Sequence, residues 1–498
     1  MTTPHTTRPT LPRVESDPRR WAGLAVLTAS LLVIVMDMTI LNVALPDLTA
    51  DLQPSAVSQL WIVDAYALAL AGLLVPLAAV GDRWGRRRML LTGFTLFGVA
   101  SLLVLLADSP GDVIAVRALL GVGGAMIMPS TLSLIRTLFP DPRERALALG
   151  VWGAMAAVGG AIGPIVGGAL LEVFNWHAAF LFNVPVMVVA IIAAVLLLPE
   201  SRSDRPGRLD PAGVVLSSGG MVSLVYGIKH LAKDGLTADS LLTLAMGALL
   251  LTVFVRRCLR EDDPMLEVRL FGRPQFTAGV LAALCTSIAM VALLLVASQW
   301  LQLVHRWSPL ETGAALLPMA VGGIIGSPLA PGVAERIGAR TVLAGGLAIA
   351  GLGLLLLFVA PSPLTYPFLA VALTLVGIGT ASLAVASAVI MGAAPSDKAG
   401  SAAAIEESSY EIGGVLGIAV LGSLAAWVYR DGLPGGADDA ARESLAGALG
   451  TPVAEQALRS FEHSFAVLGL ASGLFLLAAA ALVWWLTPAD LDLADVEH

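Results

Sequence analysis

Charged residues are scarce in this sequence. Only 13% of its 498 residues are Asp, Glu, Lys or Arg, whereas soluble domains contain about 25%. Lysine occurs only three times. Hydrophobic residues make up 57% of the chain, and the mean hydropathy is +0.84. This composition excludes a soluble globular protein, and we expect almost the whole chain to lie in a lipid bilayer.

Cysteine and histidine are also scarce. The two cysteines, Cys258 and Cys285, lie in or beside apolar runs, and the six histidines are scattered. Neither a disulfide framework nor a metal site is indicated by such spacing. The net charge of −8 argues against a nucleic-acid partner, which requires a basic face. No phosphate-binding loop and no catalytic constellation is present, so we expect neither an enzyme nor a cofactor.

The sequence does contain a long series of apolar runs. A transmembrane helix needs about 20 apolar residues, and fourteen such runs lie between charged residues or Pro and Gly breaks. The strands of a β-barrel would instead appear as short segments in which apolar and polar residues alternate. The runs in this sequence do not alternate in this way. The sequence therefore predicts an all-α polytopic membrane protein with fourteen transmembrane helices, at residues 22–46, 58–78, 90–107, 112–135, 147–171, 178–198, 211–230, 240–258, 275–302, 310–332, 341–360, 364–391, 401–427 and 464–487.

The distribution of lysine and arginine predicts the orientation. With the N-terminus in the cytosol, 22 of these residues lie on the inner side and 6 on the outer side, Lys229 among the latter, while Arg117 lies within a span. Loss of one span would invert every later loop and remove the bias. The polar residues 1–20 precede an apolar run too long for a signal peptide. We therefore expect a multi-pass membrane protein with both termini cytoplasmic.

A short motif occurs twice and indicates an internal repeat. Asp82-Arg83-Trp84-Gly85-Arg86-Arg87 follows the second span, and Glu335-Arg336-Ile337-Gly338-Ala339-Arg340 follows the tenth. If the two copies are equivalent, the first six spans correspond to the last six, and spans 7 and 8 are an insert between them. Transporters are commonly built from such halves, with the substrate site between them. The expected division is a cytosolic tail at 1–20, an N-terminal six-helix half at 21–198, a two-helix insert with its loops at 199–273, a C-terminal six-helix half at 274–487 and a second cytosolic tail at 488–498.

We interpret the repeated motif as a latch at the inner side of the membrane. Its acid would pair with arginines or with a helix N-terminus. In the simpler interpretation the basic residues only satisfy the positive-inside rule, but this would not require an acid and a glycine at fixed offsets. The expected inner-gate residues are Asp82, Arg83, Gly85, Arg86, Arg87, Glu335, Arg336 and Arg340.

Six ionisable residues lie within the expected spans and away from their ends, where a charge costs about 2.5–3.5 kcal/mol on insertion scales. Glu407 and Glu411 are four residues apart and share a helix face, while Glu406 points about 100° away. Each could simply be satisfied by a salt bridge or a hydrogen bond. Five acids against one base cannot all be paired, however, so some should take up protons or bind a cation. The six residues are Asp37, Asp64, Arg117, Glu406, Glu407 and Glu411.

Small and aromatic residues complete the expected site. Gly159, Gly163 and Gly167 are four residues apart and would let a neighbouring helix approach closely, and Pro164 would kink the same helix. Aromatic faces near the acids would attract a lipophilic cation, although aromatic residues at a membrane interface are also common. The candidates for such faces are Trp61, Tyr66, Trp152, Trp300 and Tyr410.

Four motifs together resemble those of the major facilitator superfamily, and more narrowly its fourteen-span drug:proton antiporters, which include quaternary-ammonium efflux pumps. They are Asp37-x-Thr39-x-x-Asn42 through Pro46, the loop Asp82 to Arg87, Arg117 to Gly121, and Gly159-x-x-x-Gly163-Pro164-x-x-Gly167-Gly168. The family's leading loop glycine and leucine are Ala78 and Val80 here. The resemblance covers residues 20–487 and implies the major facilitator fold.

The resemblance also implies functional roles. Acids at the positions of Asp37, Asp64, Glu406, Glu407 and Glu411 act in proton coupling or in holding cationic drugs, and the glycine motif is associated with antiport. Some relatives carry a further acid on span 10, where this chain has Gly322 and Gly323, and its absence would narrow the range of divalent cations carried.

We therefore expect a monomeric, proton-coupled antiporter that exports lipophilic, mainly cationic drugs and antiseptics by alternating access. Neutralising Asp37 should abolish export without loss of folding. A first alternative is a dedicated exporter of an endogenous metabolite or antibiotic, because the Ala-, Gly- and Arg-rich composition suggests a high-GC bacterium. A distant alternative is a membrane receptor or scaffold that does not transport.

Overall fold

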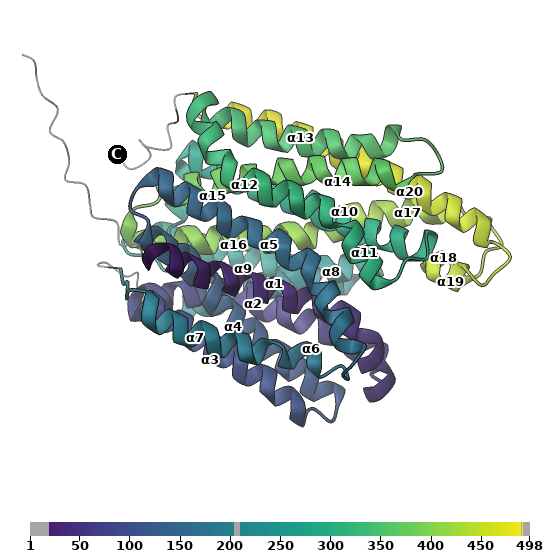
Figure 1. Cartoon of the computed structure of the whole chain (residues 1–498), viewed down its shortest axis with the longest axis horizontal. Helices are drawn as coiled ribbons and strands as arrows, with labels where there is room; N and C mark the ends of the chain where they lie inside the picture. Colours follow the sequence, from purple (N-terminus) through teal and green to yellow (C-terminus); the bar gives the residue numbers. More distant parts are fainter. Residues whose placement is uncertain (1–18, 204–209, 490, 492–498) are drawn as a thin grey trace, which may run out of the picture.

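The computed structural model describes residues 19–203, 210–489 and 491, which form helices and connecting segments without a strand. Figure 1 shows long helices running across the view, with the beginning of α1 and the end of α20 at its left-hand side. We call this side the terminal end and the other side the opposite end. The expected tails lie outside the described residues except for Arg19 and Arg20, which begin α1, and residues 488, 489 and 491.

Fourteen segments among the described residues are long and apolar enough to cross a membrane, which confirms the predicted number. The largest difference in position is at the last one, which begins at Ala454 rather than at residue 464. Helix α20 continues through Glu455, Arg459 and Glu462 because charged side chains end an apolar run without ending a helix. The spans are Arg19–Leu45, Trp61–Trp84, Arg86–Leu106, Pro110–Leu138, Pro142–Leu171, Ala178–Leu197, Pro211–Leu231, Ala238–Arg260, Pro274–Val304, Leu310–Ile337, Ala339–Val359, Tyr366–Ala393, Ala399–Asp431 and Ala454–Leu486.

Several spans contain more than one helical segment, and short helices lie in the loops. The helices are α1 (Arg19–Leu52), α2 (Ala56–Trp84), α3 (Arg86–Leu103), η1 (Val104–Leu106), α4 (Pro110–Leu138), α5 (Pro142–Leu171), α6 (Ala178–Leu181), α7 (Asn183–Leu197), α8 (Pro211–Asp234), α9 (Ala238–Arg260), η2 (Val268–Gly272), α10 (Pro274–Gln299), η3 (Trp300–Val304), α11 (Pro309–Ala315), α12 (Leu317–Ile337), α13 (Ala339–Val359), α14 (Tyr366–Thr380), α15 (Ser382–Ala393), η4 (Ser396–Lys398), α16 (Ala399–Leu416), η5 (Gly417–Gly422), α17 (Ser423–Asp431), α18 (Asp439–Glu443), α19 (Leu445–Ala448) and α20 (Ala454–Leu486). The segments η3 and η5 are π-helical, a form frequent near functional sites.

The helices form two groups with a pair of helices beside them. Helices α1–α7 pack on one another, and so do α10–α20; Figure 1 places α3 and α7 low and α13 high in the view. Helix α5 lies against α12 and α15, and α16 lies against α2 and α4, so these contacts join the groups. Helices α8 and α9 pack together, and α8 also contacts α2 and α16.

The two copies of the repeated motif form the same kind of turn. Gly85 joins α2 to α3 with a φ of 126°, and Gly338 joins α12 to α13 with a φ of 88°. A positive φ is readily adopted only by glycine. A Cβ at Gly85 would also lie 2.6 Å from a carboxylate oxygen of Glu200. The conformation therefore explains why both copies carry glycine at this position.

The three glycines of the α5 motif pack against α1, as their spacing predicts. A Cβ at Gly159 would lie 2.9 Å from the Leu32 carbonyl, and one at Gly163 would overlap the Thr39 hydroxyl. A Cβ at Gly167 would lie 3.3 Å from Ile40. Glycine thus lets α5 support the segment of α1 that carries Asp37.

Alanine at Gly163 should therefore separate the two helices, whereas alanine at Gly168 should not. We expect Gly163→Ala to destabilise the protein by about 1–3 kcal/mol, because the added methyl group overpacks the contact. A Cβ at Gly168 meets no atom within 4 Å, so Gly168→Ala is the matched control. The measurement is the thermal unfolding of both purified variants, and equal stability would contradict the close α1–α5 contact.

Candidate functional site

Asp37 lies in a buried network of polar side chains. Arg117 Nη1 of α4 donates a hydrogen bond of 2.8 Å to Asp37 Oδ2, and Asn183 Nδ2 of α7 donates one of 2.7 Å to Oδ1. The Arg117 and Asp37 side chains are only 3% and 2% exposed. Asn183 lies 3.3 Å from the Ser101 hydroxyl, to which its amide also donates. Two helices, α4 and α7, thus place donors on a single carboxylate inside the N-terminal group.

Arg117 is held by α2 as well. Its Nε donates to the carbonyl of Ile62 over 3.2 Å, and its guanidinium lies 4.5 Å from the centre of the Tyr66 ring. Tyr66 is only 1% exposed, so its ring is covered and offers no open face to a ligand. We expected Tyr66 to form part of a cavity wall, but its ring packs against Arg117 instead.

Asp64 is paired with a lysine from α8. Lys229 Nζ donates to Asp64 Oδ1, and the two side chains are 27% and 24% exposed. The expectation that Arg117 is the only cation among the acids is therefore wrong. Lys229 lies within the span Pro211–Leu231, and its long side chain brings the ammonium to the carboxylate. Two of the five acids, Asp37 and Asp64, are therefore paired.

The three glutamates of α16 have different surroundings. Ser387 of α15 donates to Glu406 Oε1, and the Tyr410 hydroxyl lies 3.4 Å from the same oxygen. Glu407 is 1% exposed; no ion pair reaches it from the described residues, and its Oε1 receives no hydrogen bond. Glu411, one turn further, is half-buried.

Such an arrangement favours uptake of a proton. A buried carboxylate without a counter-charge is costly in its charged form, and neighbouring Glu406 and Glu411 add like-charge repulsion at Glu407. Protonation of Glu407 removes both costs. Among the five acids, Glu406 and Glu407 are thus fully buried and have no ion pair within the described part of the chain. The sequence could not distinguish them from the paired acids.

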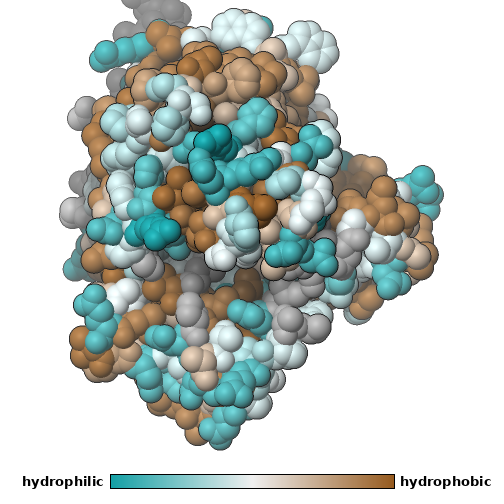
Figure 2. All heavy atoms as spheres, turned by 90° about the vertical axis from the view of Figure 1, so that its right-hand side faces the viewer, coloured by the Kyte–Doolittle hydropathy of each residue, from teal (hydrophilic) through white to brown (hydrophobic). Residues whose placement is uncertain are grey.

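Open space lies beside α5 and at the opposite end of the molecule. A Cβ at Gly153 or at Gly160 of α5 would meet no atom within 4 Å. Figure 2 looks onto the opposite end of the molecule and shows a hollow between an upper and a lower mass of side chains. On α16, exposure increases from the buried Glu407 to the half-buried Tyr410 and Glu411.

The other aromatic candidates are placed differently. Trp61 is exposed and stacks on Tyr226 of α8 with ring centres 5.8 Å apart. Trp152 is buried and donates its indole N–H to Thr131, and Trp300 is buried against His305. Of the five rings, Trp61 and Tyr410 are therefore the ones with accessible surface beside the acids.

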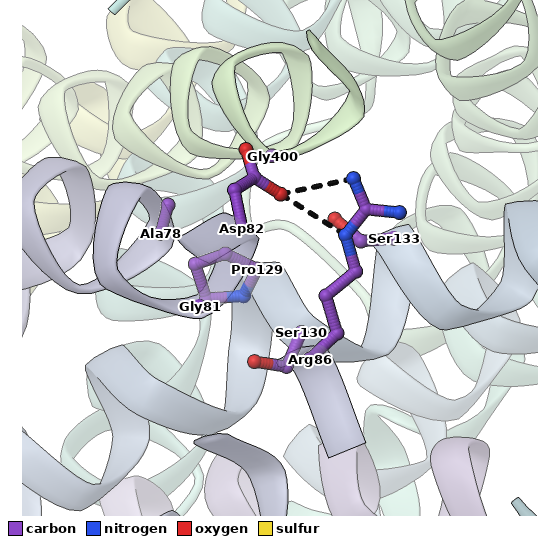
Figure 3. Close-up of a pocket in the computed structure, with 8 residues that line it drawn as sticks. All are labelled: Ala78, Gly81, Asp82, Arg86, Pro129, Ser130, Ser133 and Gly400. Carbon is purple, nitrogen blue, oxygen red and sulfur yellow. Dashed lines mark hydrogen bonds and ion pairs between the residues drawn. The ribbon is translucent and has the colours of Figure 1, made fainter. Parts of the chain in front are cut away.

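At the terminal end, the loop motif joins the two groups. Arg86 Nε donates to Asp82 Oδ1 over 3.0 Å, and the ion pair is buried. Figure 3 shows the Asp82 carboxylate beside Gly400 in the first turn of α16, where a Cβ would overlap it. Asp82 is thus paired with an arginine and also lies at a helix N-terminus. The helix dipole favours a negative charge at this position. These are the two kinds of partner that the sequence analysis expected.

Further contacts close the terminal end. Arg143 of α5 pairs with Glu335 of α12 at 3.1 Å, Arg136 donates to the Met391 carbonyl, and the Ser203 hydroxyl donates to the Asp397 carbonyl over 2.9 Å. Each bond joins the N-terminal part of the chain to the C-terminal group.

The remaining motif arginines lie elsewhere. Arg87 donates to the Val195 carbonyl over 2.6 Å, within the N-terminal group, and Arg340 lies 4.4 Å above the Trp484 ring of α20. Arg83 and Arg336 are exposed. The second copy of the motif therefore contributes Glu335 to the contact between the groups, while its arginines do not bond that acid.

Sequence reasoning missed three partners of the acids: Asn183, Lys229 and Ser387. Asn183 is the only Asn or Gln in its apolar span, Ala178–Leu197, and this signal could have identified it. Lys229 and Ser387 carry no such signal, because their pairing depends on how α8 and α15 pack. Over the described residues, no group of three His, Cys, Asp or Glu side chains is arranged to hold a metal ion.

Comparison with known proteins is consistent with this architecture. The family model described as Major Facilitator Superfamily matches residues 27–257 and 275–492. The multidrug efflux pump LfrA of Mycolicibacterium smegmatis is 39% identical over 97% of this chain and 97% of its own length. The methyl viologen resistance protein SmvA of Salmonella typhimurium is 37% identical over 94% of this chain and 98% of its own length. The human organic anion transporter MFSD10 has the same fold, with a TM-score of 0.60 at 15% identity, covering 92% of this chain and 100% of the other.

Proposed function

The chain belongs to the major facilitator superfamily, a family of membrane transporters rather than enzymes, and we propose that it is a proton-coupled antiporter that exports lipophilic cations. Its relatives include a multidrug efflux pump and a methyl viologen resistance protein. Methyl viologen is an organic dication, so the second relative supports a cationic substrate class. Efflux is thus the activity that the relatives favour.

The observation that carries the proposal is the pair of buried glutamates on α16. Glu406 and Glu407 are 0% and 1% exposed and form no ion pair with the described residues, and α16 also contacts α2 and α4 of the other group. An acid that is stable when protonated and buried, but charged when solvated or bound to a cation, can exchange a proton for a cationic substrate. This exchange is the chemical requirement of antiport.

The exchange is coupled to movement of the two halves, 21–198 and 274–487, about the central space. In the conformation described, the terminal end is closed by Asp82 at the N-terminus of α16 and by the Arg143–Glu335 pair. Opening requires these contacts to break. A cation entering from that side would then displace a proton from the α16 acids, and the proton entering from the other side would reset the cycle.

The positive-inside bias supports a cytoplasmic position of the terminal end. We propose a location in a bacterial inner membrane with both termini cytoplasmic, and a monomer as the working unit, because one chain contains both halves. No bound cofactor is required, since the proton gradient supplies the energy.

Ethidium efflux from cells that express the chain tests the proposal. Loaded cells should lose ethidium faster than cells carrying the empty vector, and a protonophore should abolish the difference. Efflux that persists with the protonophore would contradict proton coupling. No efflux from well-expressed protein would favour a dedicated exporter of an endogenous metabolite on the same fold.

A further inference from the structure

Helix α8 lies where the two helix groups meet. Its buried Met221, Val225 and Ile228 form one apolar cluster with Leu68 and Ala71 of α2 and Val415 of α16. A Cβ at Gly72 of α2 would lie 2.7 Å from a Val222 methyl group of α8, so the helices are in close contact. At the terminal end, Asp210 caps α8 and pairs with Arg257 of α9, whose hydrogen bond lowers the pKa of the Asp210 carboxyl. The first insert helix is thus part of the seam between the groups.

Near its other end, α8 delivers a positive charge to acids of both groups. The Lys229 ammonium donates to Asp64 of α2 and lies within electrostatic range of Glu411 on α16. Asp64 and Glu411 belong to different helix groups, and Lys229 comes from neither. A single cation of the protein therefore offsets negative charge at an acidic site that an organic cation would otherwise find open.

The surroundings of this cation resemble a binding site for a lipophilic one. Trp61 lies one turn before Asp64 on α2, and Tyr226 lies one turn before Lys229 on α8. The two rings stack on each other with an angle of 24° between them. Aromatic faces attract organic cations. The side chains of Lys229 and Asp64 are about a quarter exposed, at 27% and 24%, so a ligand can reach the pair.

We propose that Lys229 is a specificity-determining residue: a tethered ammonium that occupies the acidic site of Asp64 and Glu411 and competes there with cationic substrates. This inference rests on the proposed export of lipophilic cations. A substrate cation binds at this site only by displacing Lys229, so the lysine weakens binding in proportion to the charge of the ligand and favours its release. A salt bridge that only held the insert in place would not affect ligands in this way.

Binding of two cations to purified protein separates these roles. The variants are Lys229→Gln, which removes the charge, and Lys229→Arg, which keeps it. The probes are ethidium, with one positive charge, and methyl viologen, with two. We expect Lys229→Gln to bind ethidium about tenfold and methyl viologen about a hundredfold more tightly than the wild type, because the Coulomb energy scales with the charge of the ligand. Lys229→Arg should restore the weaker binding.

A second measurement uses the wild-type chain and needs no variant. The chain has three lysines, Lys229, Lys233 and Lys398. Lys398 lies 3.9 Å from Asp263 at the terminal end and is the internal control. Ethidium should increase acetylation of Lys229 by acetic anhydride, measured by mass spectrometry, because a displaced lysine is no longer held at the carboxylate and is more accessible to the reagent. Acetylation of Lys398 should not change.

The outcomes distinguish this inference from the proposed function. Folded Lys229→Gln that binds both cations no more tightly than the wild type would overturn the inference and leave proton-driven export intact. If that variant does not fold, unchanged or reduced acetylation of Lys229 with ethidium would overturn it instead. Tighter binding by Lys229→Gln together with a wild type that shows no proton-dependent efflux would support the inference and contradict the proposed function.

Discussion

Glu407→Gln is expected to reduce proton-driven ethidium efflux to the background of cells without the protein. Glutamine has nearly the shape of protonated glutamic acid but cannot lose a proton, so the exchange of proton for cation stops. Because Glu407 has no ion pair to lose among the described residues, the free energy of unfolding should change by no more than about 1 kcal/mol, a typical effect of one substitution. The measurements are efflux and thermal unfolding of the same variant.

The matched control for this prediction is Glu455→Gln at the start of α20. The Glu455 side chain is 81% exposed and pairs with Arg459 on the surface, so its neutralisation should change neither efflux nor stability. Wild-type efflux by Glu407→Gln at equal expression would show that this acid takes no part in coupling. Loss of efflux with gross unfolding would assign it a structural role instead.

Asp37→Asn is expected to abolish export and also to destabilise the protein. The substitution leaves the Arg117 guanidinium buried without its carboxylate, and breaking one partner of a buried ion pair costs about 3–5 kcal/mol. The sequence led us to expect loss of export without loss of folding. The structure adds the stability cost, because Arg117 and Asn183 both bond the Asp37 carboxylate.

A double variant separates the two effects. Asp37→Asn with Arg117→Gln removes both charges, so it should recover much of the thermal stability that Asp37→Asn loses. Its export should remain absent, because the carboxylate is still missing. Recovery of both stability and export would mean that the ion pair serves folding alone, and efflux by the single variant would contradict the role proposed for Asp37.

The apolar runs were enough to predict fourteen spans, since a membrane helix must be long and hydrophobic. The spacing of Gly159, Gly163 and Gly167 likewise predicted a close helix contact, and the structure supplies α1 as the partner. The position of Asp82 at Gly400 is the kind of contact that the motif predicted, although the sequence did not identify α16 as the helix.

Pairing within the membrane was beyond the sequence. Asp37 and Glu407 look alike as single acids in apolar runs, yet one has an arginine and an amide while the other has no ion pair within the described chain. The difference arises from packing between helices far apart in the sequence. Lys229 was counted with the outer side because it lies at the end of its apolar run, and the sequence does not show that its long side chain reaches Asp64.

The central claim is the exchange of protons for an organic cation through the α16 acids. The most direct measurement uses sealed proteoliposomes with an imposed pH gradient, and follows ethidium accumulation and proton movement together. The account predicts that wild-type protein accumulates ethidium as protons leave, and that Glu407→Gln does neither. Ethidium accumulation by wild-type protein that is independent of the gradient and moves no protons would contradict it.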